Sequence, residues 1–102
     1  MTIFVDPAKI TNYLLVPKDK NDKSRFLNDL GYSLDNWEDL ANDICKIINE
    51  NEAIFQKSSP FGGDLFEVKG QLRNFGIVTI WLLLESENTF KFVTLFPNKS
   101  DK

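Results

Sequence analysis

The chain has 102 residues, 42% of them apolar, which is enough for one hydrophobic core but not for two independent ones. It contains one cysteine and no histidine, which excludes an internal disulfide framework and the common Cys/His zinc patterns. Its net charge of −3 argues against nucleic-acid binding unless positive charge is segregated on the folded surface. We therefore expect a single domain over residues 1–102, with no metal and no cofactor.

We do not expect the chain as given to be exported by a signal of its own. Residues 1–5 lack the basic stretch and the long apolar segment of a signal peptide, and the longest apolar run, 80–84, is far too short to cross a membrane. We expect a cytoplasmic protein that does not contact membranes.

A first helix is predicted close to the N-terminus. Asp6 followed by Pro7 is typical of an N-cap with proline at the first helical position, and Pro17 ends the element. One face of this helix is apolar and consists of Ile10, Tyr13 and Leu14.

Two more helices follow a polar segment at 18–22. Gly31 ends the second, whose apolar residues Phe26, Leu27 and Leu30 have helical spacing. Ser33 is a suitable N-cap for the third, in which apolar residues recur on one face: Trp37, Leu40, Ala41, Ile44, Ile47 and Ile48. Its acidic residues form the opposite face, which is either simply solvated or binds a partner.

From Ala53 onward the pattern changes to short apolar runs divided by turn signals at 60–63, 73–76 and 86–89, which predicts four strands. Connections this short indicate antiparallel pairing. In the last strand, strict alternation places Phe90, Phe92, Thr94 and Phe96 on one face and Lys91, Val93 and Leu95 on the other.

The predicted fold class is therefore α+β, with three N-terminal helices (about 7–51) packed on a four-stranded antiparallel β-meander (about 53–97). Residues 98–102 form a polar tail. Trp81, on the central strand, is expected in the core, with base stacking as the other interpretation.

No strong catalytic motif is present. Cys45 lies in the apolar pattern of the third helix, which favours a packed thiol over a nucleophile. Gly62 and Gly63 are more typical of a hairpin turn than of a phosphate-binding loop.

Four segments nevertheless carry a family resemblance that spans nearly the whole chain. They are Lys9-Ile-Thr-Asn-Tyr13-Leu14, Lys23-Ser-Arg-Phe26 with Leu30-Gly31-Tyr32, Trp81, and Phe92-Val-Thr94-Leu-Phe96-Pro97. In order and spacing they resemble an uncharacterised domain family found at the C-termini of bacterial polymorphic toxins, in phage head-associated proteins and as stand-alone toxin candidates. The helices, the sheet and the late Thr-x-aromatic motif are also similar to the barnase, EndoU, colicin and RelE group of ribonucleases.

This second resemblance implies metal-independent RNA cleavage, in which the ribose 2′-hydroxyl attacks the neighbouring phosphate. Such a reaction needs a base, an acid and groups that stabilise negative charge, and the resemblance to RelE implies that Lys, Arg and Tyr can replace His in these roles. The catalytic candidates are Lys23 at the start of the second helix, Thr94 on the last strand, and Tyr13 as a proton donor. The alternatives are an ordinary exposed lysine, a packed β-branched residue and a core tyrosine, respectively.

Substrate-binding candidates surround these three. Lys20, Arg25 and Arg73 are candidate phosphate contacts, although surface solubility also explains them. Phe92 and Phe96 are candidate base-stacking rings on either side of Thr94, and Phe96 lacks the phenol that the resembled enzymes carry there, so no acid is assigned to it.

Two functions follow. The first is a ribonuclease toxin of a toxin–antitoxin pair, with RNA as substrate and a small cognate antitoxin or immunity protein as partner. The alternative is a non-catalytic interaction protein, either immunity- or antitoxin-like or a phage-associated adaptor, whose acidic helix face docks on a basic partner. Exposed strand edges would also allow a homodimer.

Overall fold

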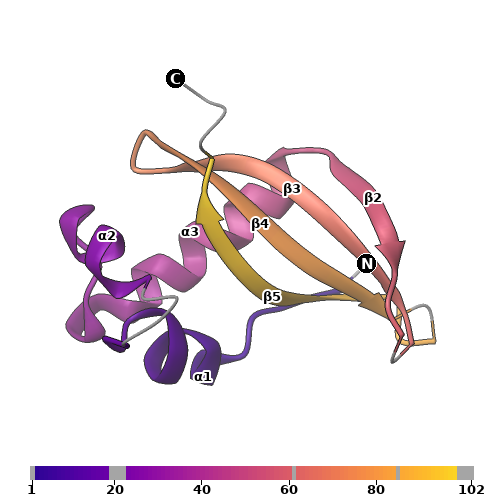
Figure 1. Cartoon of the computed structure of the whole chain (residues 1–102), viewed down its shortest axis with the longest axis horizontal. Helices are drawn as coiled ribbons and strands as arrows, with labels where there is room; N and C mark the ends of the chain where they lie inside the picture. The colour runs from indigo at the N-terminus through magenta and orange to yellow at the C-terminus, as the bar shows by residue number, and fades with distance from the viewer. Residues whose placement is uncertain (1, 19–22, 61, 85, 99–102) are drawn as a thin grey trace.

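The computed structural model describes residues 2–18, 23–60, 62–84 and 86–98, and Figure 1 shows helices packed against a twisted sheet. The described elements are β1 (Thr2–Phe4), α1 (Pro7–Lys9), the π-helix η1 (Ile10–Leu14), α2 (Ser24–Asp29), the 3₁₀ turn η2 (Leu34–Asn36), α3 (Trp37–Glu50), β2 (Ala53–Ser58), β3 (Asp64–Leu72), β4 (Phe75–Leu84) and β5 (Thr89–Pro97). None of the described helices is long and apolar enough to span a bilayer.

The α+β class is confirmed, but the predicted four-stranded sheet is wrong. The described strands form one five-stranded sheet in the order β1-β5-β4-β3-β2, in which β2 to β5 are an antiparallel meander and β1 lies parallel to β5. The extra strand precedes the helices, so the chain does not simply place all helices before all strands. Three residues are too few to show a period of two, which is why the sequence pattern did not indicate β1.

The first helix starts where the sequence predicts. Asp6 Oδ1 accepts a hydrogen bond from the Ala8 amide over 3.0 Å, and Pro7 occupies the first helical position. After Lys9 the chain continues directly into η1, with the Leu15 amide donating to the Ile10 carbonyl over 3.0 Å. Single π-helical turns are rare in proteins as a whole, and those that occur often lie at functional sites.

The junction between α2 and α3 is also placed by local signals. Gly31 adopts φ +96° directly after α2, as expected of a helix-terminating glycine. Ser33 accepts a hydrogen bond from the Asp35 amide and shares a capping box with Asn36, so it caps the short turn η2 that leads into α3.

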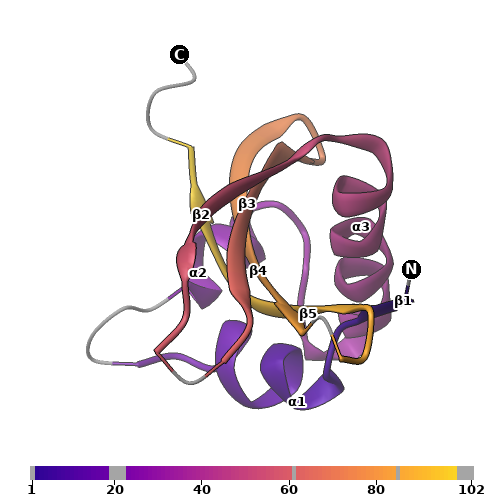
Figure 2. The ribbon, with the colours of Figure 1, turned by 90° about the vertical axis from the view of Figure 1, so that its right-hand side faces the viewer.

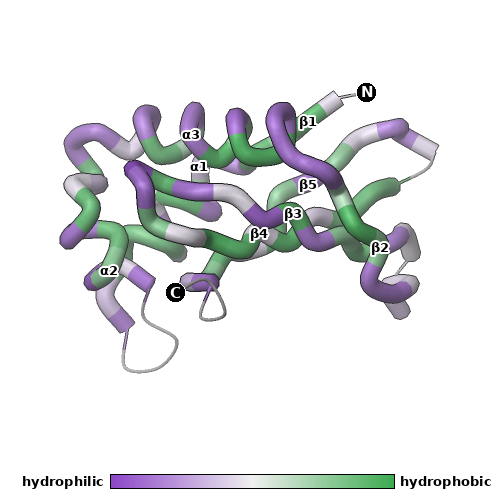
Figure 3. The backbone as a smooth tube through the Cα atoms, turned by 90° about the horizontal axis from the view of Figure 1, so that it is seen from above, coloured by the Kyte–Doolittle hydropathy of each residue, from purple (hydrophilic) through white to green (hydrophobic). Residues whose placement is uncertain are grey.

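Helix α3 covers one face of the sheet. Its buried residues are Leu40, Ile44, Ile47 and Ile48. In Figure 3 the hydrophobic residues of α3 turn toward the strands and its hydrophilic residues turn away. Gly70 of β3 lies close to α3: an added Cβ would lie 2.8 Å from Ile47 Cγ2, so this position accepts no larger side chain without a shift.

Trp81 is a core residue, as predicted, with no exposed surface. Its indole nitrogen donates to Thr79 Oγ1 over 2.8 Å, and the Thr79 hydroxyl donates in turn to the Val68 carbonyl over 2.7 Å. These two hydrogen bonds give partners to the buried indole nitrogen of Trp81 and the buried hydroxyl of Thr79.

A β-bulge in β5 changes which residues share a face. Ile80 pairs with Thr94 while Trp81 pairs with Phe92, which leaves Val93 as an inserted residue. Phe92 and Leu95 are therefore both buried, and Thr94 lies on the opposite face. The prediction that Phe90, Phe92, Thr94 and Phe96 share one face is wrong, because a strict period of two does not allow for an inserted residue.

The sheet face opposite α3, which we call the outer face, carries Thr94 and Phe96. By pairing and alternation it also carries Val78, Ile80 and Leu82 of β4. Figure 1 looks onto this face, and α3 lies behind the strands. Figure 2 shows the same relationship from the side, with α1 below the sheet and α3 along one flank.

Candidate functional site

The hydroxyl of Tyr13 lies where η1, α2 and β5 meet. Lys23 Nζ donates a hydrogen bond to Tyr13 Oη over 3.1 Å, and Tyr13 Oη lies 3.3 Å from Thr94 Oγ1. Tyr13 and Thr94 are 81 positions apart in the chain. The structure thus brings together the three residues selected from the sequence as catalytic candidates.

We call these three residues, together with Lys9 and Lys18, the Tyr13 cluster. Local features of the backbone place Tyr13, Lys23 and Thr94. Tyr13 lies in the π-helix η1, in which Ile10 and Leu14 are buried. Lys23 is the residue before α2, and its side chain makes no capping bond to the helix. Thr94 reaches the outer face because of the bulge at Val93.

Positive charge is concentrated around the Tyr13 ring. The ammonium groups of Lys18, Lys23 and Lys9 lie 3.8, 5.3 and 5.9 Å from the ring centroid, within the range of cation–π attraction. Although the net charge of the chain is negative, positive charge is therefore concentrated locally around Tyr13. Nucleic-acid binding by an acidic chain would require such a segregation of charge.

These contacts lower the pKa of Tyr13 below its ordinary value of 10.0. The hydrogen bond with Thr94 contributes most, followed by the one from Lys23; partial burial opposes them, and the charges of Lys23 and Lys18 add to the lowering. A lowered pKa means that the Tyr13 phenol gives up its proton more readily than an ordinary tyrosine does.

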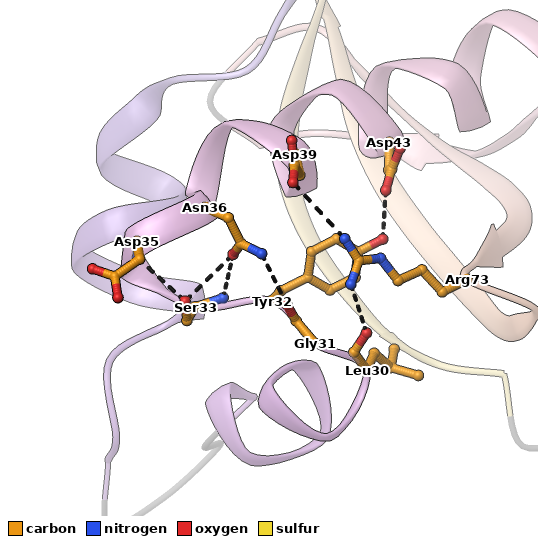
Figure 4. A network of polar contacts seen from close by, with 9 residues as sticks. All are labelled: Leu30, Gly31, Tyr32, Ser33, Asp35, Asn36, Asp39, Asp43 and Arg73. Carbon is orange, nitrogen blue, oxygen red and sulfur yellow. Dashed lines mark hydrogen bonds and ion pairs between the residues drawn. The ribbon is translucent and has the colours of Figure 1, made fainter.

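Arg73 has a different set of contacts, shown in Figure 4. Its Nη1 donates to the Leu30 carbonyl over 3.0 Å, its guanidinium carbon lies 4.2 Å from the centroid of the Tyr32 ring, and its Nη2 is 3.9 Å from Asp39 Oδ2. These contacts tie the β3–β4 turn to the α2–α3 junction. Within the described part of the chain, the hydrogen bonds of the Tyr13 hydroxyl do not include Arg73, which the sequence suggested as a phosphate contact.

Tyr32 lies under Arg73 and is fully buried. Its hydroxyl donates to Asp43 Oδ2 over 2.6 Å. Burial raises the pKa of Tyr32 well above its ordinary value, and the hydrogen bond to Asp43 raises it further. The pKa values of the two tyrosines are therefore shifted in opposite directions, down for Tyr13 and up for Tyr32.

The remaining substrate-binding candidates differ in their exposure to solvent. Phe92 is 4% exposed and packs edge-on against Trp81 at 5.4 Å, so it is a core residue, whereas Phe96 is 40% exposed on the same face as Thr94. The expected pair of base-stacking rings is thereby reduced to one. Arg25 is exposed on α2, and Lys20 falls outside the described residues.

Sequence reasoning did not assign Lys9 and Lys18 to the site, although a signal for Lys9 was present. Lys9 precedes Tyr13 by four positions, a spacing that puts two helical residues on one face. Lys18 follows Pro17 outside any regular element, so no periodicity could have indicated its position over the ring.

Two other features of the molecule, a groove and a cysteine, do not favour a functional site. A groove of about 620 Å³ lies between α3 and β3, but side chains of both charges line it, including Asp43, Lys46, Glu50 and Arg73, so it favours no ligand class. Burial raises the pKa of the Cys45 thiol, which fits a packed residue better than a nucleophile. The described residues contain no group of three or more potential metal ligands.

Comparisons with known proteins add a family but no activity. A family model described as "Domain of unknown function (DUF6883)" matches residues 1–99, which is nearly the whole chain. No curated protein and no solved structure matches.

Proposed function

The chain belongs to the DUF6883 family, and we propose that it is a metal-independent endoribonuclease whose catalytic group is the Tyr13 cluster. The observation that carries the proposal is the line of contacts from the Lys23 ammonium through the Tyr13 phenol to the Thr94 hydroxyl. A phenol with a lowered pKa held beside an ammonium is a base and an acid in direct contact.

The reaction needs nothing beyond these groups and the substrate. The Tyr13 phenolate accepts the proton of the ribose 2′-hydroxyl, and the 2′-oxygen attacks phosphorus. The bond from phosphorus to the 5′-oxygen breaks, and the leaving oxygen takes a proton from the Lys23 ammonium. The products are a 2′,3′-cyclic phosphate and a 5′-hydroxyl.

The contact between the two residues also restores them after each turnover. Cleavage leaves Tyr13 as a neutral phenol and Lys23 as a neutral amine, joined by the 3.1 Å hydrogen bond. Transfer of the phenol proton to the amine along this bond regenerates phenolate and ammonium without a proton from solvent.

The remaining members of the cluster stabilise charge. The Thr94 hydroxyl keeps its contact with Tyr13 and stabilises the phenolate. Lys9 and Lys18 stabilise the charge that develops on the phosphoryl group.

The resemblance to polymorphic toxins supports a biological setting for this activity. We place the enzyme in the cytoplasm, where its RNA substrate is, as the toxin of a toxin–antitoxin pair. A small cognate antitoxin or immunity protein is its proposed partner.

A second candidate function rests on α3. Its exposed side, turned away from the sheet, carries Glu38, Asp39 and Glu50, and an acidic face of this kind fits a basic protein partner. In that case the chain acts as a non-catalytic interaction protein, and the Tyr13 cluster is a structural contact between the helices and β5.

Inducible expression in a bacterial host, followed by mapping of RNA ends, separates the two. The native chain should arrest growth and produce 2′,3′-cyclic phosphate ends, and Tyr13→Phe and Lys23→Met should each reduce cleavage by a factor on the order of 10² to 10⁴. Lys57→Met, an exposed lysine on β2, serves as the matched control and should cleave like the native chain.

Purified protein tested on RNA in the presence of a chelator completes the experiment. Intact RNA with the native chain, both in cells and in solution, would show that the ribonuclease proposal is wrong. Capture of a basic protein that depends on Glu38 and Asp39 would then favour the interaction protein.

A further inference from the structure

Phe96 is the exposed ring beside the Tyr13 cluster on the outer face. Thr94 pairs with Ile80 and Phe96 pairs with Val78, so the two side chains point to the same side of β5, two residues and about 7 Å apart. Phe96 is 40% exposed although it lies in β5, whose other aromatic residues, Phe90 and Phe92, are buried. The ring therefore keeps a free surface next to the hydroxyl that contacts Tyr13.

The surroundings of Phe96 combine two chemistries. The half-buried Ile80 and Leu82 give the outer face of β4 a partly exposed aliphatic surface, whereas Val78 is buried there. Tyr13, whose hydroxyl contacts Thr94, has the ammonium groups of three lysines within 6 Å of its ring centroid: Lys9, Lys18 and Lys23. An apolar surface next to concentrated positive charge is complementary to a nucleotide, which joins a planar base to a phosphate.

We propose that the outer face binds single-stranded RNA, with the base next to the scissile phosphate stacked on Phe96. This inference rests on the proposed function, because it takes the phosphate to be the group held at the Tyr13 cluster. A base within a duplex is paired and stacked on both sides, so it cannot reach the ring without leaving the helix. The site therefore selects unpaired RNA.

Stacking, rather than hydrogen bonding, dominates this recognition. Every base has an aromatic face, so one ring accepts all four bases with modest preferences. The expected substrate class is thus broad in sequence and narrow in structure: loops, tails and other unpaired regions.

Binding of a fluorescent 2′-O-methyl oligoribonucleotide tests the inference without cleavage, because this probe has no free 2′-hydroxyl. Phe96→Ala should weaken binding of the single strand about 5- to 150-fold, the range that corresponds to loss of one base-stacking contact. Phe96→Trp should bind at least as tightly as the native chain. Phe55→Ala, which removes a ring that is 53% exposed on β2, should leave the affinity within about twofold.

The outcomes are distinct. Unchanged affinity in Phe96→Ala, or equal affinity of the native chain for a matched duplex, would overturn the inference even if the native chain cleaves RNA. Binding that depends on Phe96, in a chain that leaves natural RNA intact, would support the inference while contradicting the catalytic proposal. Circular dichroism of each variant confirms that a weaker affinity is not the result of unfolding.

Discussion

The Arg73 guanidinium donates a hydrogen bond to the Leu30 carbonyl over 3.0 Å, and this contact connects the two halves of the candidate site. Leu30 ends the helix that begins after Lys23. Arg73 lies in the turn between β3 and β4, and β4 pairs with the strand that carries Thr94. Arg73 thereby fixes the helix of Lys23 relative to the strand of Thr94, although it is a candidate phosphate contact by sequence.

Arg73 occupies an unfavourable backbone conformation to do so. Arg73 and Asn74 form a two-residue hairpin turn with φ +51° and +71°, a geometry that glycine and asparagine adopt most easily. A non-glycine residue in this region costs roughly 1–2 kcal/mol, which the contacts with Leu30, Tyr32 and Asp39 offset. Such positions persist where the surrounding structure holds them.

Loss of the Arg73 contacts should affect both stability and the distant phenol. We expect Arg73→Ala to lower the free energy of unfolding by about 1–3 kcal/mol, measured by urea denaturation. Arg73→Lys keeps the charge but not the planar stacked group, and it should recover only part of this loss. In both variants the pKa of Tyr13 should move up toward 10, because α2 no longer holds Lys23 against it. An unaltered Tyr13 titration would show that Arg73 acts on stability alone.

The pKa of Tyr13 should respond directly to its two partners. Lys23→Met removes a hydrogen bond and a positive charge, and Thr94→Val removes the other hydrogen bond, so each should raise the pKa of Tyr13. Ultraviolet absorbance of tyrosinate follows the titration, and a Tyr32→Phe background leaves Tyr13 as the sole tyrosine. Lys57→Met is the control for a change of net charge. A Tyr13 pKa that stays constant in all variants would argue against the contacts described above.

Stability at alkaline pH should depend on Tyr32. Its folded-state pKa is raised, so the stabilisation is fully present below the unfolded value near 10 and is lost as pH rises through the folded value. The native chain should therefore lose stability relative to Tyr32→Phe between roughly pH 9 and 12. Urea denaturation across this range measures the difference, and Tyr13 contributes equally to both proteins. A constant difference between the two would contradict the raised pKa.

Gly31 should be more sensitive to substitution than Gly62, although their φ angles, +96° and +100°, are similar. A Cβ at Gly31 would lie 2.4 Å from Arg73 Nη1, whereas a Cβ at Gly62 would have nothing within 4 Å. Both alanine variants carry the backbone cost of about 1 kcal/mol, and Gly31→Ala should cost about 1–2 kcal/mol more. Arg73→Ala in the Gly31→Ala background should remove that excess, as a double-mutant cycle of unfolding free energies can show.

Local signals predicted the helices well because their causes are local. Asp6 with Pro7 and Gly31 act on neighbouring backbone groups, so they can be recognised within a few residues. Three members of the Tyr13 cluster, namely Tyr13, Lys23 and Thr94, were also selected from the sequence, since they belong to segments with a family resemblance. Their contact was not predicted, because it joins residues 81 positions apart through the packing of η1 against β5.

The features that the sequence did not reveal depend on contacts with distant parts of the chain. β1 is defined by its pairing with β5, since three residues carry no period of their own. The role of Arg73 depends on the helix end that lies across from its turn, and a polar residue in a turn gives no sign of such a partner. Phe92 and Phe96 have equivalent positions in the sequence pattern and lie on opposite faces because Val93 is an extra residue in β5 without a partner in β4.

The bulge at Val93 also makes the pairing register of β5 part of the chemistry. A regular strand gives one side only its even or only its odd positions, so it could not bury Phe90 and Phe92 and still direct Thr94 toward Tyr13. Removing Val93 would make the strand regular and leave these faces unchanged, because Trp81 already pairs with Phe92 and Ile80 with Thr94. Regular pairing of the intact strand, with Val93 opposite Ile80, would instead turn Thr94 to the buried face and disable the proposed site as thoroughly as replacing it, while leaving every contact residue in the chain.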